Sequence, residues 1–370
     1  MAAVTTYDLK AVGAHFCILG DFVAGDRYGS GHINDTFAVI YDQAGTKLRY
    51  IFQRINHNIF KNPVALMENI QRVTAHLGAK MAGKADGSRR VLTLVPAHDG
   101  QPYFQDATGN TWRCYLFIEK ATTYDVIVTV DQAEKAAAAF GSFQGLLVDL
   151  PGGRLNETIP NFHHTVSRFA TLEKTIAEDP AGRAKLCQPE IAYALKNKAL
   201  ASCLLDLQAK GLLPERITHN DTKLNNVMLD NATGEGICVI DLDTVMPGLA
   251  LYDFGDMIRT ATSPAAEDDP DLGKSTMRMP FFAALVKGYL STAGTFLSQT
   301  EKDCLALSGQ LITFEIGIRF LTDFLMGDVY FKVHVENHNL HRCRTQFKLA
   351  ADIAAKMAEM NALVKTLDQP

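Results

Sequence analysis

The first third of the chain alternates short apolar runs with turn residues, which is the pattern of antiparallel strands joined by hairpins. Asn62 and Pro63 then precede apolar residues spaced three or four apart, and this spacing predicts one helix with Asn62 as its cap. The expected strands are 16–20, 37–41, 47–55, 91–95 and 111–118. This part of the chain is therefore expected to form five strands and one helix.

After the fifth strand the alternation ends and helical spacing takes over. Asp131 and Glu134 have the spacing of a capping box in front of an alanine-rich run. The further expected helices are 161–177, 188–211, 277–297, 299–326 and 343–366. We therefore predict an α+β chain of two lobes. Residues 1–118 would form a small antiparallel-β lobe with one helix, and residues 119–370 a larger, mainly α lobe.

Composition narrows the classes of function. The net charge of −5 gives no sign of the basic face that non-specific nucleic-acid binding requires, so no nucleic-acid partner is expected. The seven cysteines are an odd number without a C-x-x-C pair, which predicts reduced thiols. Lys287 interrupts the apolar segment 281–297, and the N-terminus lacks the features of a signal peptide. We expect a soluble, cytoplasmic protein without a membrane partner.

The middle of the chain carries the most specific pattern of polar residues. His219, Asp221 and Asn226 occur as H-x-D-x-x-x-x-N, which has the shape of a kinase catalytic loop with Asn220 in place of the usual Arg. Twenty residues after Asp221, a short β-branched run ends in Asp241. A tight loop would turn the side chains of Asp221 and Asn226 toward one centre.

Phosphoryl transfer from ATP needs a carboxylate that accepts the proton of the attacking hydroxyl, and oxygen ligands for the Mg²⁺ that bridges the phosphates. We interpret Asp221 as the catalytic base and Asn226 and Asp241 as metal ligands, with ATP and Mg²⁺ as cofactors. The competing interpretation is a polar turn followed by an unrelated edge strand, in which Asp241 only caps a turn.

A glycine-containing turn near the N-terminus is the candidate cover for the nucleotide phosphates. Gly29 and Gly31 allow backbone N–H groups to approach phosphate oxygens closely, although an ordinary hairpin turn has the same composition. Arg54, on the second strand after this turn, stands where a kinase places the cation that holds the phosphates. Glu68, on the following helix, is its candidate partner, and solvated side chains are the alternative for both.

Residues 117–121 are the expected hinge between the lobes. Backbone groups of Phe117, Ile118 and Glu119 would read the adenine edge there, and Phe117 or Ile118 would flank the ring. The hinge therefore completes the predicted nucleotide site.

Two further motifs are not assigned to phosphoryl transfer. Asp253-Phe-Gly255 has the composition of a kinase magnesium loop, but it lies too far beyond the catalytic loop. Asp253 is expected to cap a helix or to brace the catalytic loop through backbone N–H groups. His163 and His164 are adjacent, so their side chains diverge, and a solvated helix start is expected there instead of a metal site.

These motifs together carry a family resemblance. Segments 219–226 and 240–244 resemble the aminoglycoside phosphotransferase/choline kinase superfamily, which has a protein-kinase-like fold. Arg54 with its neighbours and the run 66–70 are similar to the N-acetylhexosamine 1-kinases in particular. This resemblance implies a bilobal fold and transfer of the ATP γ-phosphoryl group to the anomeric hydroxyl of free N-acetylglucosamine or N-acetylgalactosamine, with Asp221 at O1.

The same resemblance implies sugar contacts. His32, Arg319 and Tyr330 match positions that contact the sugar in the family. Each has an alternative: His32 would only turn its loop, Arg319 would pair with Glu315 on its own helix, and Tyr330 would lie in the core. Thr260 departs from the family pattern, in which an aromatic residue stands near the sugar. This departure leaves the preferred sugar open.

Two rival functions remain at this point. A kinase of the same fold would act on another small alcohol, such as a different sugar, an amino alcohol, homoserine or an aminoglycoside. An inactive kinase-like binding module is the alternative outside enzymes. The sequence indicates no oligomeric state.

Overall fold

The computed structural model describes residues 7–29, 31 and 33–368, which divide into two compact units. The first unit runs to Ala121 and also contains Asp149–Ile159 and Ile237–Val245. The second contains Thr122–Val148, Pro160–Gly236 and the chain from Met246 onward. The predicted boundary near residues 117–121 stays a prediction. The predicted first lobe did not include the two later segments that belong to the first unit.

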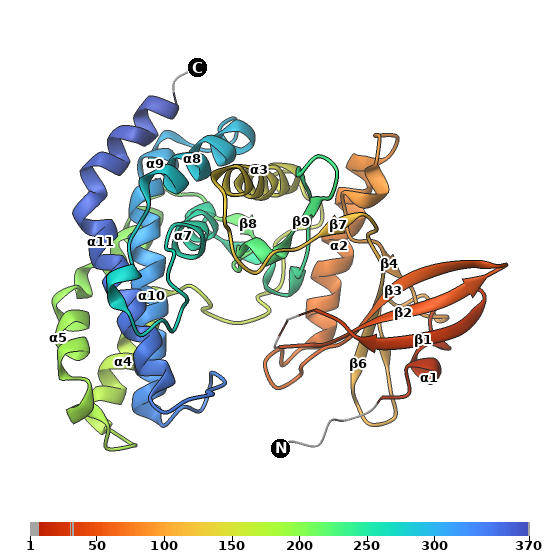
Figure 1. The fold of residues 1–370 in the computed structure, drawn as a ribbon, viewed down its shortest axis with the longest axis horizontal. Coiled ribbons are helices and arrows are strands. Elements are labelled where there is room, and N and C mark those ends of the chain that lie inside the picture. The colour runs from red at the N-terminus through yellow and green to blue at the C-terminus, as the bar shows by residue number, and fades with distance from the viewer. Residues whose placement is uncertain (1–6, 30, 32, 369–370) are drawn as a thin grey trace. The chain divides into compact units, whose positions relative to one another are not determined.

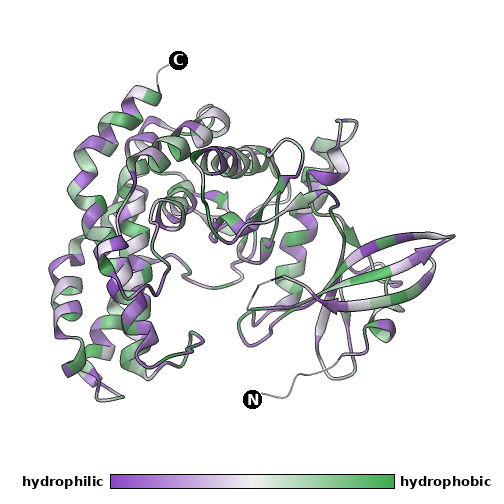
Figure 2. Cartoon of the chain, in the orientation of Figure 1, coloured by the Kyte–Doolittle hydropathy of each residue, from purple (hydrophilic) through white to green (hydrophobic). Residues whose placement is uncertain are grey.

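An antiparallel sheet organises the first unit (Figure 1). Within the described residues its strands follow the order β1-β2-β3-β6-β4, and β5 pairs with β6. The strands are β1 Asp21–Arg27, β2 Asp35–Gln43, β3 Thr46–Arg54, β4 Leu94–Val95, β5 Phe104–Gln105 and β6 Thr111–Leu116. In Figure 2, apolar and polar residues alternate in bands along β1 to β3. Phe37, Val39 and Tyr41 of β2 are buried in the core of this unit, together with Trp112.

One predicted strand is wrong. Residues 16–20 contribute only an isolated bridge from Phe16 to Ala97, and the first strand begins at Asp21. Phe16 is 1% exposed and follows a short helix, α1 Leu9–Gly13, that the pattern did not predict. Phe16 is therefore buried in a turn, whereas Leu19 of the same run is 80% exposed.

Helix α2 Pro63–Met81 starts as predicted. The Asn62 side chain caps it by accepting a hydrogen bond from the Ala65 N–H at 3.1 Å. Its apolar stripe is buried and includes Leu66, Ile70, Val73 and Leu77.

The second unit is mainly helical (Figure 1). Its helices are α3 Val130–Leu147, α4 Thr165–Glu178, α5 Gln188–Lys196, α6 Cys203–Ala209, α7 Ala250–Ala261, α8 Met279–Ala293, α9 Gln299–Asp303, α10 Leu305–Met326 and α11 His338–Leu367. Strand β8 Arg216–Thr218 pairs antiparallel with β11 Met246–Gly248, and β9 Val227–Asp230 follows the loop after β8. Strands β7 Ala121–Thr122 and β10 Gly236–Val239 lie where the chain passes between the units.

The remaining short elements are 3₁₀ turns at Gly87–Arg89, Ala184–Leu186, Lys198–Ser202, Leu224–Asn226, Leu242–Thr244 and Leu272–Lys274. The predicted class, an antiparallel-β N-terminal part followed by a helical C-terminal part, is confirmed.

Two details of the helical prediction are wrong. The capping box of α3 is formed by Thr129 and Gln132, not by Asp131 and Glu134, because the Thr129 hydroxyl accepts the Gln132 N–H at 3.2 Å and the Gln132 side chain accepts the Thr129 N–H at 3.3 Å. Two expected helices are interrupted: the one over 188–211 by a 3₁₀ turn between α5 and α6, and the one over 299–326 at Cys304 between α9 and α10.

Glycines allow two pairs of helices in the second unit to cross closely. A Cβ atom at Gly288 of α8 would clash with the backbone oxygen of Glu134 in α3. A Cβ atom at Gly255 of α7 would clash in the same way with the backbone oxygen of Ser308 in α10. The second crossing positions α7, whose Asp253 contacts the predicted catalytic loop.

Helix α10 has the length and hydropathy of a membrane span, but 72% of its apolar window is buried inside the protein. It packs against α4, α7 and α11, so it is the core helix of the second unit. All seven cysteines are free thiols, as their spacing predicted.

Candidate active site

The predicted catalytic loop follows β8 and is braced by a buried carboxylate. Asp253 on α7 is 0% exposed and accepts hydrogen bonds from the backbone N–H groups of His219 at 2.8 Å and Asn220 at 2.7 Å. Its own carbonyl oxygen accepts the Thr222 hydroxyl at 2.6 Å. Asn220 has a left-handed backbone with φ of 66°, which is uncommon outside glycine. The expectation that Asp253 braces this loop is therefore confirmed.

A second layer holds Asp253 in turn. Gln144 of α3 donates from Nε2 to Asp253 Oδ2 at 2.6 Å, and its Oε1 accepts the Tyr289 hydroxyl at 2.5 Å. Burial raises the pKa of Asp253, and the loop N–H groups and Gln144 oppose this rise. Three donors point at the carboxylate, which is the pattern that an ionised acid requires.

His163 supports the same loop from another side, and the prediction of a solvated histidine is wrong. Its Nδ1 lies 2.7 Å from Glu315 Oε1, and its Nε2 lies 3.1 Å from the backbone oxygen of Asn220. The Thr165 hydroxyl donates to the other oxygen of Glu315 at 2.5 Å. Both His163 and Glu315 are buried. His164 does lie at a helix start, where its ring caps α4 by accepting the Ser167 N–H.

Opposing effects act on the pKa of His163. Burial lowers this pKa, but the charge and hydrogen bond of Glu315 raise it above its ordinary value of 6.5. Conversely, burial raises the pKa of Glu315, and His163 holds it below its ordinary value of 4.5. The two side chains therefore form a buried ion pair beside the catalytic loop.

The loop brings Asp221 and Asn226 together. Asn226 Nδ2 donates to the Asp221 backbone oxygen at 2.8 Å and to Asp221 Oδ2 at 3.1 Å. Since the amide nitrogen makes both bonds, the amide oxygen of Asn226 has no hydrogen bond to any described residue. Lys223 Nζ lies 2.9 Å from Asp221 Oδ1. Burial raises the pKa of Asp221, but Lys223, with smaller effects of His219 and Arg259, holds it below its ordinary value of 3.8.

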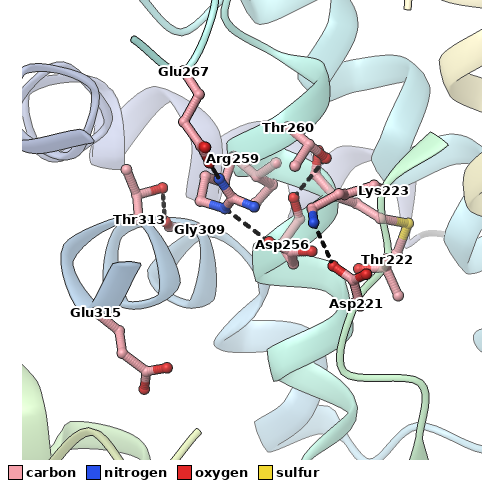
Figure 3. A network of polar contacts seen from close by, with 12 residues as sticks. Asp221, Thr222, Lys223, Asp256, Arg259, Thr260, Glu267, Gly309, Thr313 and Glu315 are labelled. Atoms are coloured by element: carbon pink, nitrogen blue, oxygen red, sulfur yellow. Dashed lines mark hydrogen bonds and ion pairs between the residues drawn. The ribbon is translucent and has the colours of Figure 1, made fainter. Parts of the chain in front are cut away.

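A network of charges on α7 faces this pair (Figure 3). Arg259 donates from Nε to Asp256 Oδ1 at 2.8 Å and from Nη1 to Glu267 Oε1 at 3.0 Å. The Thr260 hydroxyl donates back to the Asp256 carbonyl oxygen at 2.8 Å, one turn earlier on the helix. Thr260 therefore uses its hydroxyl within the helix.

Arg319 on α10 lies beside two aromatic rings. Its Cζ is 5.1 Å from the ring centre of Phe162 and 5.7 Å from that of Phe331. Within the described part of the chain it has no hydrogen bond or ion pair, and the pairing with Glu315 is not formed because that carboxylate is bonded to other groups. Tyr330 is 51% exposed, which excludes the alternative of a core residue.

The segment that carries Phe331 is anchored by a buried acid. Asp323 is 3% exposed and accepts the backbone N–H groups of Val329, Tyr330 and Phe331 at 2.8–2.9 Å. Asn339 Nδ2 donates to it as well, at 2.8 Å. The loop after α10 is thus fixed next to the Arg319 side chain.

Asp241 belongs to the first unit, whereas Asp221 and Asn226 belong to the second. Asp241 follows β10, is exposed, and has a left-handed backbone with φ of 58° and ψ of 59°. Its side chain does not cap the 3₁₀ turn Leu242–Thr244, so the interpretation of Asp241 as a mere turn cap is wrong. An exposed carboxylate here and the amide oxygen of Asn226 are of the donor type that Mg²⁺ takes.

The predicted pairing of Arg54 with Glu68 is not formed. Arg54 Nη2 lies 2.6 Å from Asp35 Oδ2, its direct cross-strand neighbour, and Glu68 accepts a hydrogen bond from Asn156 at 3.0 Å. The cross-strand position is nearer than the helix, so Arg54 pairs within the hairpin.

The two candidate phosphate-loop glycines lie in open space. Gly29 has a φ of 79°, and a Cβ atom at Gly29 or Gly31 would meet no atom within 4 Å. His32 lies outside the described residues. The role of the turn stays a prediction.

The hinge segment leaves some backbone groups without a hydrogen bond to the described residues. The Glu119 side chain is bonded to Arg49, and its carbonyl oxygen accepts Arg89 Nε at 3.1 Å. The Phe117 N–H donates to the Arg49 carbonyl oxygen, and the Phe117 ring lies 3.7 Å from the Arg49 guanidinium. Ile118, which is 7% exposed, has no backbone hydrogen bond to any described residue. Its N–H and C=O are among the groups of this segment that are left for a ligand.

The sequence of the chain matches the model of a known family. A family model described as the phosphotransferase enzyme family covers residues 25–292 of the chain. The chain belongs to this family. Structures of phosphotransferases have the same fold, and among them is an aminoglycoside phosphotransferase from Alicyclobacillus acidocaldarius, with a TM-score of 0.64, 11% sequence identity, and coverage of 99% of both chains.

Two further kinases resemble this phosphotransferase in fold. A microcompartment-associated aminopropanol kinase has a TM-score of 0.57 and 16% identity, and the match covers 95% of this chain and 98% of the other. A spectinomycin phosphotransferase in complex with ADP and spectinomycin has a TM-score of 0.55 and 12% identity, with coverage of 94% and 96%. At these identities the likeness shows the fold.

Sequence reasoning missed several residues of the candidate site. Lys223 stands inside the motif itself, two residues after Asp221, and a cation so close to the predicted catalytic carboxylate was a usable signal. Gln144, His163 and Glu315 come from distant helices, so no local pattern connects them with the loop.

Proposed function

We propose that this phosphotransferase is an ATP- and Mg²⁺-dependent kinase that phosphorylates the anomeric hydroxyl of a free N-acetylhexosamine to give the sugar 1-phosphate. The family membership and the braced loop that carries Asp221 support the reaction type. The ADP complex of the spectinomycin phosphotransferase supports a nucleotide as the donor. The substrate class rests on Arg319.

Asp221 would act as the base. Its depressed pKa keeps the carboxylate ionised at neutral pH, ready to accept the proton of the attacking hydroxyl. Lys223 would keep Asp221 ionised and orient it, while Asp253 and His163 would keep the loop backbone in place. Positioning of this kind provides much of the catalysis in phosphoryl transfer.

Nucleotide and metal would be held by polar groups of the loop, the hinge and the glycine-containing turn. Asn226 and Asp241 would be the metal ligands, and the bound Mg²⁺ would neutralise charge on the transferred phosphoryl group. The backbone of Ile118 would bind the adenine edge, with Phe117 and Glu119 on either side of it. Gly29 and Gly31 would allow the turn to approach the phosphates.

Arg319 supports a neutral acceptor. It is connected to the catalytic loop through Phe162 and His163, whose ring touches the Asn220 backbone oxygen. Burial and, to a smaller extent, the neighbouring Arg319 charge lower the pKa of Arg168, while Glu315 opposes this, so Arg168 and Arg319 are two cations whose fields overlap here. A cationic amine would be repelled, whereas the hydroxyl and acyl oxygens of an N-acetylhexosamine would accept hydrogen bonds from Arg319. Tyr330 and His32 are the further candidate contacts.

The acidic run 267–271 does not supply a basin for a cationic substrate. Glu267 is paired with Arg259, and Asp268 is paired with His338 at 2.8 Å. The run is therefore partly neutralised, which weighs against an aminoglycoside or amino alcohol as the acceptor. The aminopropanol kinase shares the fold, so an amino alcohol remains the rival substrate to test.

The test is ATP consumption with Mg²⁺ against free sugars, amino alcohols, homoserine and aminoglycosides, with phosphorus NMR of the product. We expect turnover with N-acetylglucosamine or N-acetylgalactosamine and a sugar 1-phosphate signal. Arg319→Met should raise the KM for the sugar about tenfold or more and leave the KM for ATP unchanged, because a lost hydrogen bond to a charged group costs about 1.5–3 kcal/mol. Asp221→Asn should abolish transfer and keep ATP binding.

Other outcomes identify the alternatives. Turnover confined to an amino alcohol would refute the sugar assignment and keep the catalytic loop. Tight ATP binding without turnover on any acceptor would favour the inactive binding module.

A further inference from the structure

The core of the first unit contains a charged pair that the proposed function does not use. Arg113, on β6, is 1% exposed and donates from Nη1 to Asp243, whose side chain is 4% exposed. Its Nε donates to Gln53 Oε1 at 2.9 Å. Apolar residues of similar volume often stabilise a fold as well as a buried ion pair does. A buried ion pair at this position is therefore weak evidence for a purely stabilising role.

Asp243 is fixed from three segments of the chain. Besides Arg113 on β6, Asn34 donates from Nδ2 to its Oδ2 at 2.6 Å. The Thr158 hydroxyl donates to its backbone oxygen at 2.8 Å. These partners come from the sheet, from the turn before β2 and from the segment 149–159. The 3₁₀ turn that contains Asp243 is therefore held firmly to the first unit.

The same turn begins at Asp241. A left-handed backbone at a residue other than glycine is strained and persists where the surroundings fix it. Burial lowers the pKa of Arg113, but the charges of Asp243 and, to a smaller extent, Asp241 raise it above its ordinary value. The Asp241 carboxylate thus lies within the field of the Arg113 guanidinium, although of the two carboxylates only Asp243 is hydrogen-bonded to it.

We propose that Arg113 is a positioning residue for Asp241. By holding Asp243 it fixes the turn that presents the Asp241 carboxylate to the Mg²⁺ of a magnesium nucleotide. The inference rests on the proposed function, because the role of Asp241 as a metal ligand belongs to it. In this proposal Arg113 of β6 anchors the turn Leu242–Thr244, which follows Asp241. The expected bond between Arg54 and Glu68 of helix α2 is not formed.

The test is calorimetric titration of the full-length protein with ADP, in Mg²⁺ and in EDTA. Arg113→Met combined with Asp243→Leu replaces both charges by apolar groups, which avoids a buried unpaired charge. Tyr115→Phe is the matched control: Tyr115 lies two residues further along β6, and its buried hydroxyl has no hydrogen-bond partner among the described residues. Far-UV circular dichroism checks that each variant is folded.

We expect the double variant to lose about tenfold or more of the affinity gained from Mg²⁺, as second-layer metal-site variants do, while its affinity in EDTA changes less than about threefold. Tyr115→Phe should match the wild type in both conditions. Where the double variant does not fold, Arg113→Lys replaces it and should lose part of the Mg²⁺ gain.

Three results would overturn the inference. An unchanged Mg²⁺ gain in the folded Arg113 variant would show that the pair does not position Asp241. Equal losses in Mg²⁺ and EDTA would show a purely structural role. A wild-type protein that binds ADP no more tightly in Mg²⁺ would refute the metal role of Asp241 and, with it, the proposed function.

Discussion

Asp253→Asn tests the brace of the catalytic loop directly. The carboxylate accepts three donors: the N–H groups of His219 and Asn220, and Gln144 Nε2. An asparagine has one acceptor oxygen, so at least one buried donor loses its partner, which costs about 1–3 kcal/mol. Removal of a buried charge offsets part of this cost, since burial raises the pKa of Asp253. We expect a net loss of about 2 kcal/mol in the free energy of unfolding.

The assay is urea unfolding followed by far-UV circular dichroism, which reports on the helical second unit. The same variant should lower kcat by about 100-fold, because a small displacement of a catalytic group has effects of that size. Asp131→Asn is the control, since Asp131 is 67% exposed and its pair with Lys135 is an i,i+4 surface contact. If Asp253→Asn unfolds within about 0.5 kcal/mol of the wild type and retains its kcat, the brace is irrelevant to the loop.

Three further predictions concern the second unit. Lys223→Met removes the main group that lowers the pKa of Asp221, so the acid limb of the kcat/KM profile should move to higher pH; an unmoved limb would exclude this coupling. His163→Gln should destabilise the protein by about 3 kcal/mol at about pH 6 and by less at about pH 9, because the raised pKa of His163 makes its pair with Glu315 a contribution that is lost as pH rises. Equal effects at both pH values in urea unfolding would contradict that ion pair. Gly255→Ala should lower the free energy of unfolding by about 2 kcal/mol, because the added Cβ forces α7 away from α10. An unchanged urea midpoint would show that the two helices have room for this Cβ atom.

The sequence predicted the fold class because periodicity and caps are local signals. Asn62 with Pro63 located the start of α2, and alternating residues located β2 and β3. The prediction of a strand at 16–20 was wrong because Phe16 is buried without regular structure. The predicted cap of α3 was wrong because both Thr129 and Asp131 are residue types that can cap a helix. Such choices depend on tertiary packing, which a single sequence does not reveal.

The site was predicted as far as its motif extends along the chain. Asp221 and Asn226 lie in one loop, so their meeting followed from the spacing, and the structure brings them together. Arg54 and Glu68 were matched by residue type alone, and geometry favoured a nearer acid for Arg54. The bond between Arg113 and Asp243 spans 130 positions, and no spacing rule connects residues so far apart.

Arg113 and Asp243 are 130 positions apart, so they become available for pairing at different times during synthesis of the protein. Arg113 leaves the ribosome 130 residues before Asp243, which is about 10 s at about 5–20 residues per second. During this interval the nascent sheet contains a cation whose buried partner does not yet exist, and the segments 149–159 and 237–245 are still missing from the first unit. The first unit therefore completes its core only after much of the second has been translated. A fragment that ends at the hinge would contain every strand of the sheet and still be an unfinished module.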